Sequence, residues 1–113
     1  MPIPEFNEIK VPALQWFAKG DGKPHRISEV FEALAGYFNL TDQEKNELVP
    51  SGVQRRWHNR ANWACYDLFR AGLLDRPKKG VYLITQEGRK VAATNPKVID
   101  RDFLMQFPKF VDF

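Results

Sequence analysis

The stretch that most constrains the fold runs from residue 53 to residue 74 and reads VQRRWHNRANWACYDLFRAGLL. At about 100° per residue, its small and apolar side chains fall along one side of a helix. That side is formed by Trp57, Ala61, Ala64, Cys65, Leu68 and Ala71. We therefore expect a helix from about Val53 to Ala71 that packs on neighbouring elements, with Gly72 as its C-terminal cap.

The N-terminal half of this helix is unusually polar. Between Arg55 and Trp63 the chain has three Arg, one His, two Asn and two Trp. Most of these side chains fall off the apolar side, so a partner can reach them. Arg can pair bidentately with guanine and Asn with adenine, and Arg and Lys also bind phosphates. These residue types suit a helix that enters the major groove of DNA.

Positive charge is concentrated around the same helix. The 113-residue chain has a net charge of +3, but residues 51–79 alone carry seven Lys/Arg and two Asp/Glu. Residues 1–50 have a net charge of −3. A basic segment in a nearly neutral protein predicts a polyanionic partner that meets one face. The alternative, an ordinary solvated helix face, would more commonly mix both signs of charge.

The first half of the chain predicts three shorter helices. Apolar residues at helical spacing indicate a helix over residues 7–18, with Pro12 at its start or at a kink. A second helix follows His25, and Ser28 is its expected N-cap. Thr41 opens a capping box in the sequence TDQE, and VPSG at 49–52 ends the short third helix.

The second half predicts a hairpin and a further helix. Residues 73–76 and 81–84 read as strands on either side of a basic turn, and Thr85 caps a helix over residues 86–93. A short strand at residues 25–27 can pair with the hairpin. The expected fold is mainly α with a small β-hairpin or sheet, a winged helix-turn-helix. The long helix would then enter the major groove, and the hairpin would be the wing.

The candidate DNA contacts lie on the long helix and on the wing. The wing residues are expected to contact the DNA backbone or the minor groove. The full set is Arg55, Arg56, His58, Asn59, Arg60, Asn62, Trp63, Arg76, Lys78 and Lys79.

Five of these residues have alternative interpretations. For Arg76, Lys78 and Lys79 the alternative is an ordinary solvated turn. His58 is either a contact or an ordinary surface histidine. Trp63 either packs in the core or at its boundary, or forms an aromatic plate for a base or a methyl group. We assign the other two tryptophans, Trp16 and Trp57, to the core.

The sequence shows no catalytic, metal or cofactor site. It contains no GxSxG, Walker or HExxH motif. The single cysteine, Cys65, excludes an intramolecular disulfide and a Cys-based zinc site, and we expect it in the core. His25 and His58 lack metal-ligand spacing. With no apolar run of membrane-spanning length and no secretory leader, we expect a cytoplasmic, nucleoid-associated protein that is not itself an enzyme.

Several stretches resemble the N-terminal domain of Mrr-type, modification-dependent (type IV) restriction endonucleases. They are NRANWACYDLFRAGLL, KKGVYLITQEGR and the NP that follows, together with MPIPEF, VPALQWFA and LTDQEKNELVPSG. The resemblance covers about residues 4–96. The matching skeleton is Asn59-Arg60, Trp63-Ala64, Leu68, Ala71-Gly72-Leu73, Gly80, Leu83–Thr85 and Gly88.

The resemblance implies a winged-helix domain at residues 1–96 that binds double-stranded DNA. It implies methylated DNA, carrying N6-methyladenine or 5-methylcytosine, as the ligand, with Trp63 and Asn59 near the modified base. In this family the cleavage domain is a separate C-terminal PD-(D/E)xK nuclease, which this sequence does not contain. Residues 97–113 would be a tail or linker toward that missing domain, with a possible short helix at 100–106. Whether the chain is part of a nuclease or a separate protein stays open.

Two other functions remain possible at this point. Winged helices also serve in protein–protein interaction, and the aromatic tail could form a homodimer or partner surface. The tail residues concerned are Phe103, Phe107, Phe110 and Phe113. A transcriptional regulator would share the DNA-binding chemistry but would prefer one operator sequence.

Overall fold

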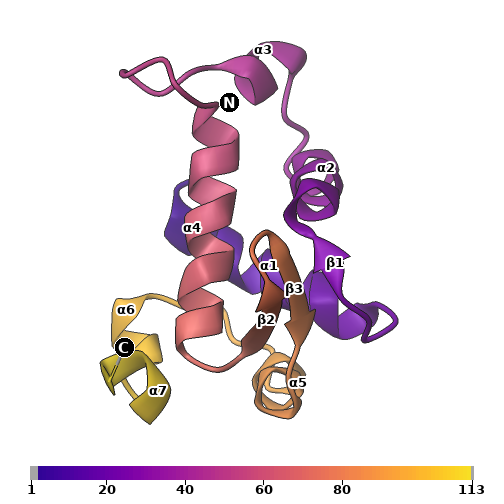
Figure 1. The fold of residues 1–113 in the computed structure, drawn as a ribbon, viewed down its shortest axis with the longest axis vertical. Coiled ribbons are helices and arrows are strands. Elements are labelled where there is room, and N and C mark those ends of the chain that lie inside the picture. Colours follow the sequence, from indigo (N-terminus) through magenta and orange to yellow (C-terminus); the bar gives the residue numbers. More distant parts are fainter. Residues whose placement is uncertain (1–2, 113) are drawn as a thin grey trace.

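A 15-residue helix, α4 (Arg56–Arg70), is the central element of the computed structural model, which describes residues 3–112 (Figure 1). The elements in chain order are α1 (Phe6–Lys19), β1 (His25–Arg26), α2 (Ile27–Tyr37), α3 (Asp42–Asn46), α4, β2 (Leu74–Lys78), β3 (Val81–Ile84), α5 (Gln86–Ala93), α6 (Arg101–Leu104) and α7 (Pro108–Asp112). Helices dominate and the strands form one small sheet, which confirms the predicted fold class.

The sheet is antiparallel and has the strand order β1–β3–β2. His25 pairs with Tyr82, and Leu74 pairs with Ile84, so β3 lies between the two outer strands. The two-residue strand β1 confirms the predicted third strand. The backbone N–H of Ile27 donates to the Gly80 carbonyl over 2.8 Å, so the turn of the hairpin is tied to the start of α2.

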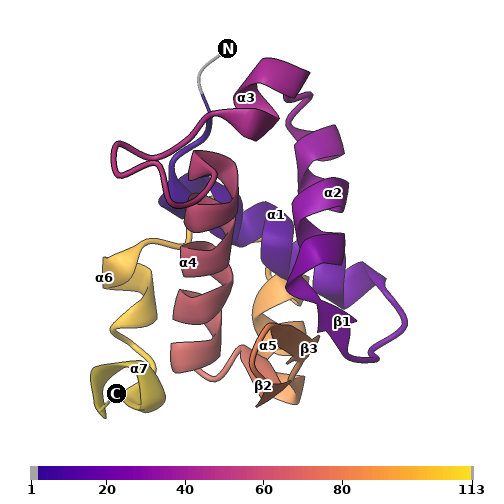
Figure 2. The same cartoon turned by 45° about the horizontal axis from the view of Figure 1, so that its top comes forward.

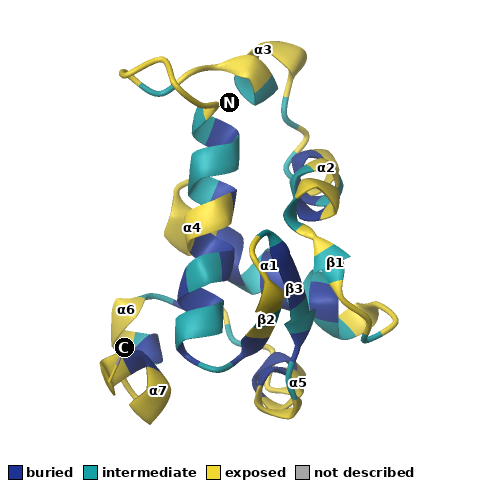
Figure 3. Ribbon diagram, in the orientation of Figure 1, coloured by how far each residue is buried: buried dark blue, intermediate teal, exposed yellow. Residues whose placement is uncertain are grey.

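The core lies between α4, α1 and the sheet. The six small and apolar residues predicted for the inner side of α4 are all at most 3% exposed (Figure 3). Three of them are alanines, which let the α1 backbone approach closely, and α1 packs more extensively on α4 than on any other element. α1 contributes Ile9, Ala13, Leu14 and Phe17 to the same core, and Pro12 lies inside the helix.

The start of α2 differs from the prediction. Ser28 lies in the first turn, and the N-cap is Arg26, whose backbone N–H donates to Glu29 Oε2 over 2.8 Å. Strand β1 ends at Arg26 and leads directly into the helix. The sheet pairing of this short strand, which sequence preference for capping residues cannot reveal, therefore sets the helix start.

The boundaries of α4 also differ. The helix begins at Arg56 because the preceding residues form a small ribbon, closed by a Leu48–Arg55 bridge and by the Arg56 N–H donating to Glu47 O over 2.8 Å. Ala71 is the C-cap, and Gly72 follows it with a φ of 82°, a conformation that favours glycine. The connection from α2 is thus far longer than a simple helix-turn-helix turn, since it contains α3 and this ribbon.

The C-terminal tail packs on the same core. Asp100 caps α6, which is shorter than predicted, and α7 was not predicted at all. Ile99 and Leu104 are fully buried and Phe110 is nearly so. In Figure 2, α6 and α7 lie along the C-terminal half of α4.

The three tail phenylalanines that lie within the described residues pack on the domain and do not form an exposed surface, which corrects one expectation. Phe110 is buried, and Phe103 and Phe107 pack against the core as partly buried side chains. Phe113 lies outside the described residues. The large apolar side chains that the described part of the tail exposes are Val98, Met105 and Val111.

Candidate nucleic-acid interface

The outward side of α4 carries polar and aromatic side chains. Arg55, Asn62 and Trp63 are exposed, and Asn59 is partly exposed. Trp63 is 50% exposed, so it does not pack in the core and lies at the boundary of the domain. The reason is helical geometry, because one step along the chain from buried Ala64 rotates a side chain by about 100°.

The other two tryptophans pack inward as predicted. Trp57 is 1% exposed, and its indole Nε1 donates to the Phe31 carbonyl over 3.2 Å. Trp16 is partly buried against the core and meets the Phe17 ring edge-on at 5.1 Å. Trp63 is thus the tryptophan that a partner of α4 can reach.

The three arginines at the start of α4 have different environments. Arg55 is exposed and forms no ion pair with any described residue. Arg56 pairs with Glu47, with 2.7 Å between Nε and Oε2. Arg60 donates to the carbonyls of Ile3 and Pro4 over 2.7 and 3.3 Å, and its Nη2 lies 3.4 Å from a Glu5 carboxylate oxygen.

The contacts of Arg60 tie the N-terminal segment to α4. Its side chain is 19% exposed, so most of the guanidinium contacts other residues of the domain. Nothing in the local sequence indicates this role, because the carbonyl partners lie more than 50 residues away along the chain.

His58 lies where α4 meets α2. Its ring stacks on Phe31 with 4.1 Å between centroids and 7° between planes. Partial burial and the nearby positive charge of Arg55 lower the pKa of His58, while Glu32 opposes the shift. The surroundings of His58 thus favour its neutral form, and its ring takes part in helix packing, so it is not an ordinary surface histidine.

The wing residues fall into two groups. Lys78 and Lys79 are exposed and form no ion pair with any described residue. Arg76 is partly buried, and its guanidinium carbon lies 5.3 Å from the Tyr66 ring centroid and 5.1 Å from that of Phe69. Arg76 therefore contacts α4, whereas the two lysines face solvent.

We group the exposed residues of α4 and of the hairpin tip under one name, the α4–wing surface. Its members are Arg55, Asn59, Asn62, Trp63, Lys78 and Lys79. The sequence of α4 contains a single acid, Asp67, and this carboxylate is buried 3.1 Å from Lys10 Nζ. α4 itself consequently exposes no carboxylate, and the exposed acids beside it, Glu47 and Glu5, lie against Arg56 and Arg60.

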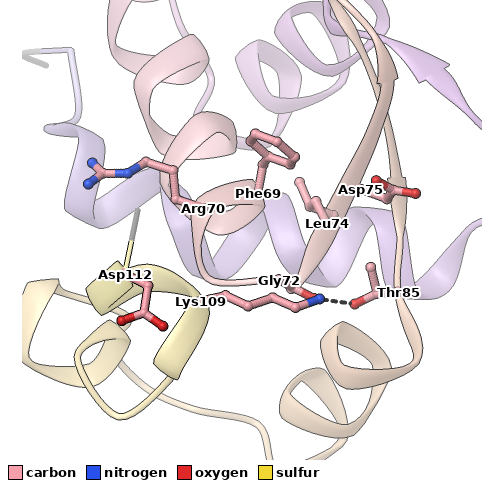
Figure 4. A pocket seen from close by; sticks show the side chains of 8 residues that line it. All are labelled: Phe69, Arg70, Gly72, Leu74, Asp75, Thr85, Lys109 and Asp112. Atoms are coloured by element: carbon pink, nitrogen blue, oxygen red, sulfur yellow. Dashed lines mark hydrogen bonds between the residues drawn. The ribbon is translucent and has the colours of Figure 1, made fainter.

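A cavity of about 520 Å³ lies at the opposite, C-terminal end of α4, between β2 and α7 (Figure 4). Its lining carries Asp75 and Asp112 as well as Arg70 and Lys109. In Figure 4 the Arg70 side chain points away from the other labelled groups. The remaining lining has two carboxylates and one ammonium group, so the cavity offers no basic site for a polyanion.

Chemically reactive groups are few in the described part of the chain. Burial raises the pKa of the Cys65 thiol to about 12, so this cysteine is an uncharged core residue as predicted. Residues 3–112 contain no cluster of three or more His, Cys, Asp or Glu able to hold a metal ion. The helices within this range are too short or too polar to cross a lipid bilayer.

Residues 6–94 match the Mrr N-terminal domain family. The chain is also similar to the type IV methyl-directed restriction enzyme EcoKMrr of Escherichia coli (strain K12), with 33% identity over 98 residues. The aligned region covers 86% of this chain and 31% of that enzyme, so the chain spans about a third of its relative. No solved structure gives a significant match. The family match and this relative show that the chain belongs to the Mrr N-terminal domain family.

Proposed function

We propose that this domain binds double-stranded DNA through the α4–wing surface. The observation that carries the proposal is the outward side of α4, which presents Arg55, Asn59, Asn62 and Trp63 and no acid of the helix's own sequence. The relative's description as a methyl-directed restriction enzyme supports it. A 15-residue helix is roughly 22 Å long. One half of such a helix can enter the major groove, which is roughly 12 Å wide.

The polar residues divide the task between base reading and phosphate binding. Asn59 and Asn62 lie one turn apart on α4, and an Asn side chain can pair bidentately with adenine N6 and N7. Arg55, Lys78 and Lys79 have no ion-pair partner among residues 3–112 and suit phosphate contacts. Each such contact contributes about 0.9 to the slope of log affinity against log salt.

Trp63 is the residue through which the domain would read a methyl group, with Asn59 beside it. We propose that the modified base is N6-methyladenine or 5-methylcytosine. Burying one methyl group against an indole is worth about 0.8 kcal/mol, which corresponds to about a fourfold preference. Such a preference is modest, so additional discrimination would have to come from the hydrogen bonds of Asn59.

In a longer restriction protein the domain would direct a C-terminal nuclease domain to its DNA target in the cytoplasm. This part of the proposal rests on the relative, of which the chain spans 31%. The tail at residues 97–112 would then form the connection, although it packs on the domain core through Leu104 and Phe110.

The test is a binding comparison by fluorescence anisotropy. Three 20-base-pair duplexes of one sequence are compared: unmodified, with N6-methyladenine and with 5-methylcytosine. We expect one modified duplex to bind more tightly, and Trp63→Ala to abolish the difference. Asn46→Ala, an exposed Asn on α3, is the matched control and should change nothing. Equal affinity for the three duplexes would remove the methyl-reading part, and absence of binding would remove the whole proposal.

A further inference from the structure

Strand β2 contains a bulge at Arg76 and Pro77. Asp75 pairs with Leu83 and Lys78 pairs with Val81, so β2 has one residue more than β3 between these two pairs. A bulge breaks the alternation of side chains and commonly redirects one of them. Here it separates Arg76, which is partly buried, from Lys78, which is exposed two residues later.

The redirected Arg76 lies over two aromatic rings of α4. Its guanidinium carbon is 5.3 Å from the Tyr66 centroid and 5.1 Å from the Phe69 centroid, within the range of cation–π attraction. The Tyr66 and Phe69 rings are 5.8 Å apart, and Phe69 meets Tyr82 of β3 at 6.5 Å. Arg76 thus holds two helix rings against the sheet.

The same row of rings reaches Trp63. Trp63 and Tyr66 lie three residues apart on α4, with 5.9 Å between centroids and an angle of 87° between planes. We call the row of Trp63, Tyr66, Phe69 and Tyr82 the aromatic ladder. Its outer end is the half-exposed Trp63, and its inner end is the buried Tyr82 of the sheet.

We infer that Arg76 is a positioning residue, which sets the orientation of Trp63 on the DNA-facing side of α4 through the Tyr66 ring. The inference rests on the proposed function for its consequence in DNA recognition. Sequence alone suggests another role for Arg76, a contact with the DNA backbone. The geometry favours positioning, because the guanidinium that would meet a phosphate covers the two rings instead.

The two roles predict different responses to Arg76→Ala in DNA binding. Removal of a phosphate contact weakens binding to every duplex and lowers the salt slope by about 1. Removal of a positioning residue leaves the salt slope unchanged and weakens the preferred duplex by about fivefold, the size of a lost cation–π contact. Lys78→Ala, an exposed cation of the same strand, is the control that should lower the slope.

A second measurement uses the free protein and does not depend on DNA. Protein labelled with 5-fluorotryptophan gives one ¹⁹F resonance for each of its three tryptophans, and Trp63→Phe assigns the one of interest. Arg76→Ala should shift or broaden the Trp63 resonance, whereas Lys78→Ala should leave it in place. The Trp57 resonance reports that the core is intact. If Arg76→Ala shifts the Trp57 resonance, the core is disturbed, and the measurement is repeated with Arg76→Gln.

Either of two results overturns the inference. One is a Trp63 resonance that does not respond to loss of Arg76, and the other is a fall of the salt slope equal to that of Lys78→Ala. A protein that binds none of the duplexes disproves the proposed function, and the ¹⁹F measurement then decides by itself whether Arg76 positions Trp63.

Discussion

His58 and Phe31 stack face to face, with 4.1 Å between ring centroids, and so connect α4 to α2. This contact uses a histidine whose neutral form is favoured by its surroundings, because partial burial and Arg55 lower its pKa. The packing of α4 on α2 is therefore sensitive to protons.

The His58 contact predicts a loss of stability in mild acid. The pKa of His58 is lower in the folded than in the unfolded state, so the unfolded chain binds the proton more readily. The contribution of neutral His58 to the free energy of unfolding is complete above the pKa of the unfolded state, about 6.5. This contribution is lost as the pH falls below that value. Urea unfolding of His58→Phe, which keeps a ring against Phe31, should lack this component. An unchanged pH profile in the variant would contradict the assignment.

His25 predicts the opposite pH dependence. Burial lowers its pKa, but Asp21 and Glu29, at 2.9 and 3.3 Å from its two ring nitrogens, raise it to a net value above normal. The stabilisation is complete below about pH 6.5 and is lost as the pH rises through the raised folded pKa.

The measurement for His25 is the urea midpoint of His25→Asn between pH 5 and pH 8. The difference from the unsubstituted protein should shrink toward alkaline pH. A difference that grows toward alkaline pH would show that the two carboxylates do not hold the charged ring.

The buried ion pair of Lys10 and Asp67 predicts a large cost for removing one partner. Lys10 is fully buried, and its Nζ lies 3.1 Å from Asp67 and 2.8 Å from the side-chain oxygen of Asn7. Lys10→Ala should lower the free energy of unfolding by about 3 kcal/mol, because an incompletely compensated carboxylate remains inside.

The control for this prediction is the surface pair of Lys45 and Asp42, 3.5 Å apart, in which the Asp42 side chain is 96% exposed. Lys45→Ala should cost less than about 1 kcal/mol in the same denaturant titration. An equal loss in the free energy of unfolding for Lys10→Ala and Lys45→Ala would mean that the buried ion pair stabilises the domain no more than the surface pair does.

Alanine substitutions at two glycines should change the stability of the domain in opposite directions. A Cβ at Gly88 would overlap the carbonyl oxygen of Leu73 and crowd Ile84, so Gly88→Ala should destabilise the domain by about 2 kcal/mol or more. Gly36 lies in α2 with no atom within 4 Å of an added Cβ. Gly36→Ala should stabilise by about 0.5–1 kcal/mol, because alanine is the better helix former. Thermal unfolding of both variants tests this, and two shifts of the same sign would contradict it.

The features that followed from the sequence are those with local causes. The inner side of α4, from Trp57 to Ala71, was predictable because helical spacing alone places these residues together. The Thr41 and Thr85 caps were predictable for the same reason, since each accepts a backbone N–H three residues later.

The features that sequence reasoning missed depend on contacts distant in the chain. The partners of Arg60 lie at the N-terminus, and Lys10 is buried because it meets Asp67 across the α1–α4 contact. The bulge at Arg76 and the helix at Pro108–Asp112 depend on packing against α4, which leaves no periodic signal in so short a segment. The candidate interface could therefore be proposed from the sequence. Which of its side chains are exposed, and which contact other parts of the domain, could not be predicted.

The central claim is that the α4–wing surface binds duplex DNA, and the slope of log Kd against log salt tests it most directly. Substituting Arg55, Lys78 and Lys79 together by alanine should lower that slope by about 3, at about 0.9 for each phosphate contact. The control removes three exposed lysines elsewhere, Lys23, Lys90 and Lys97, and should leave the slope unchanged. Equal slopes for the two triple variants would contradict the proposed surface.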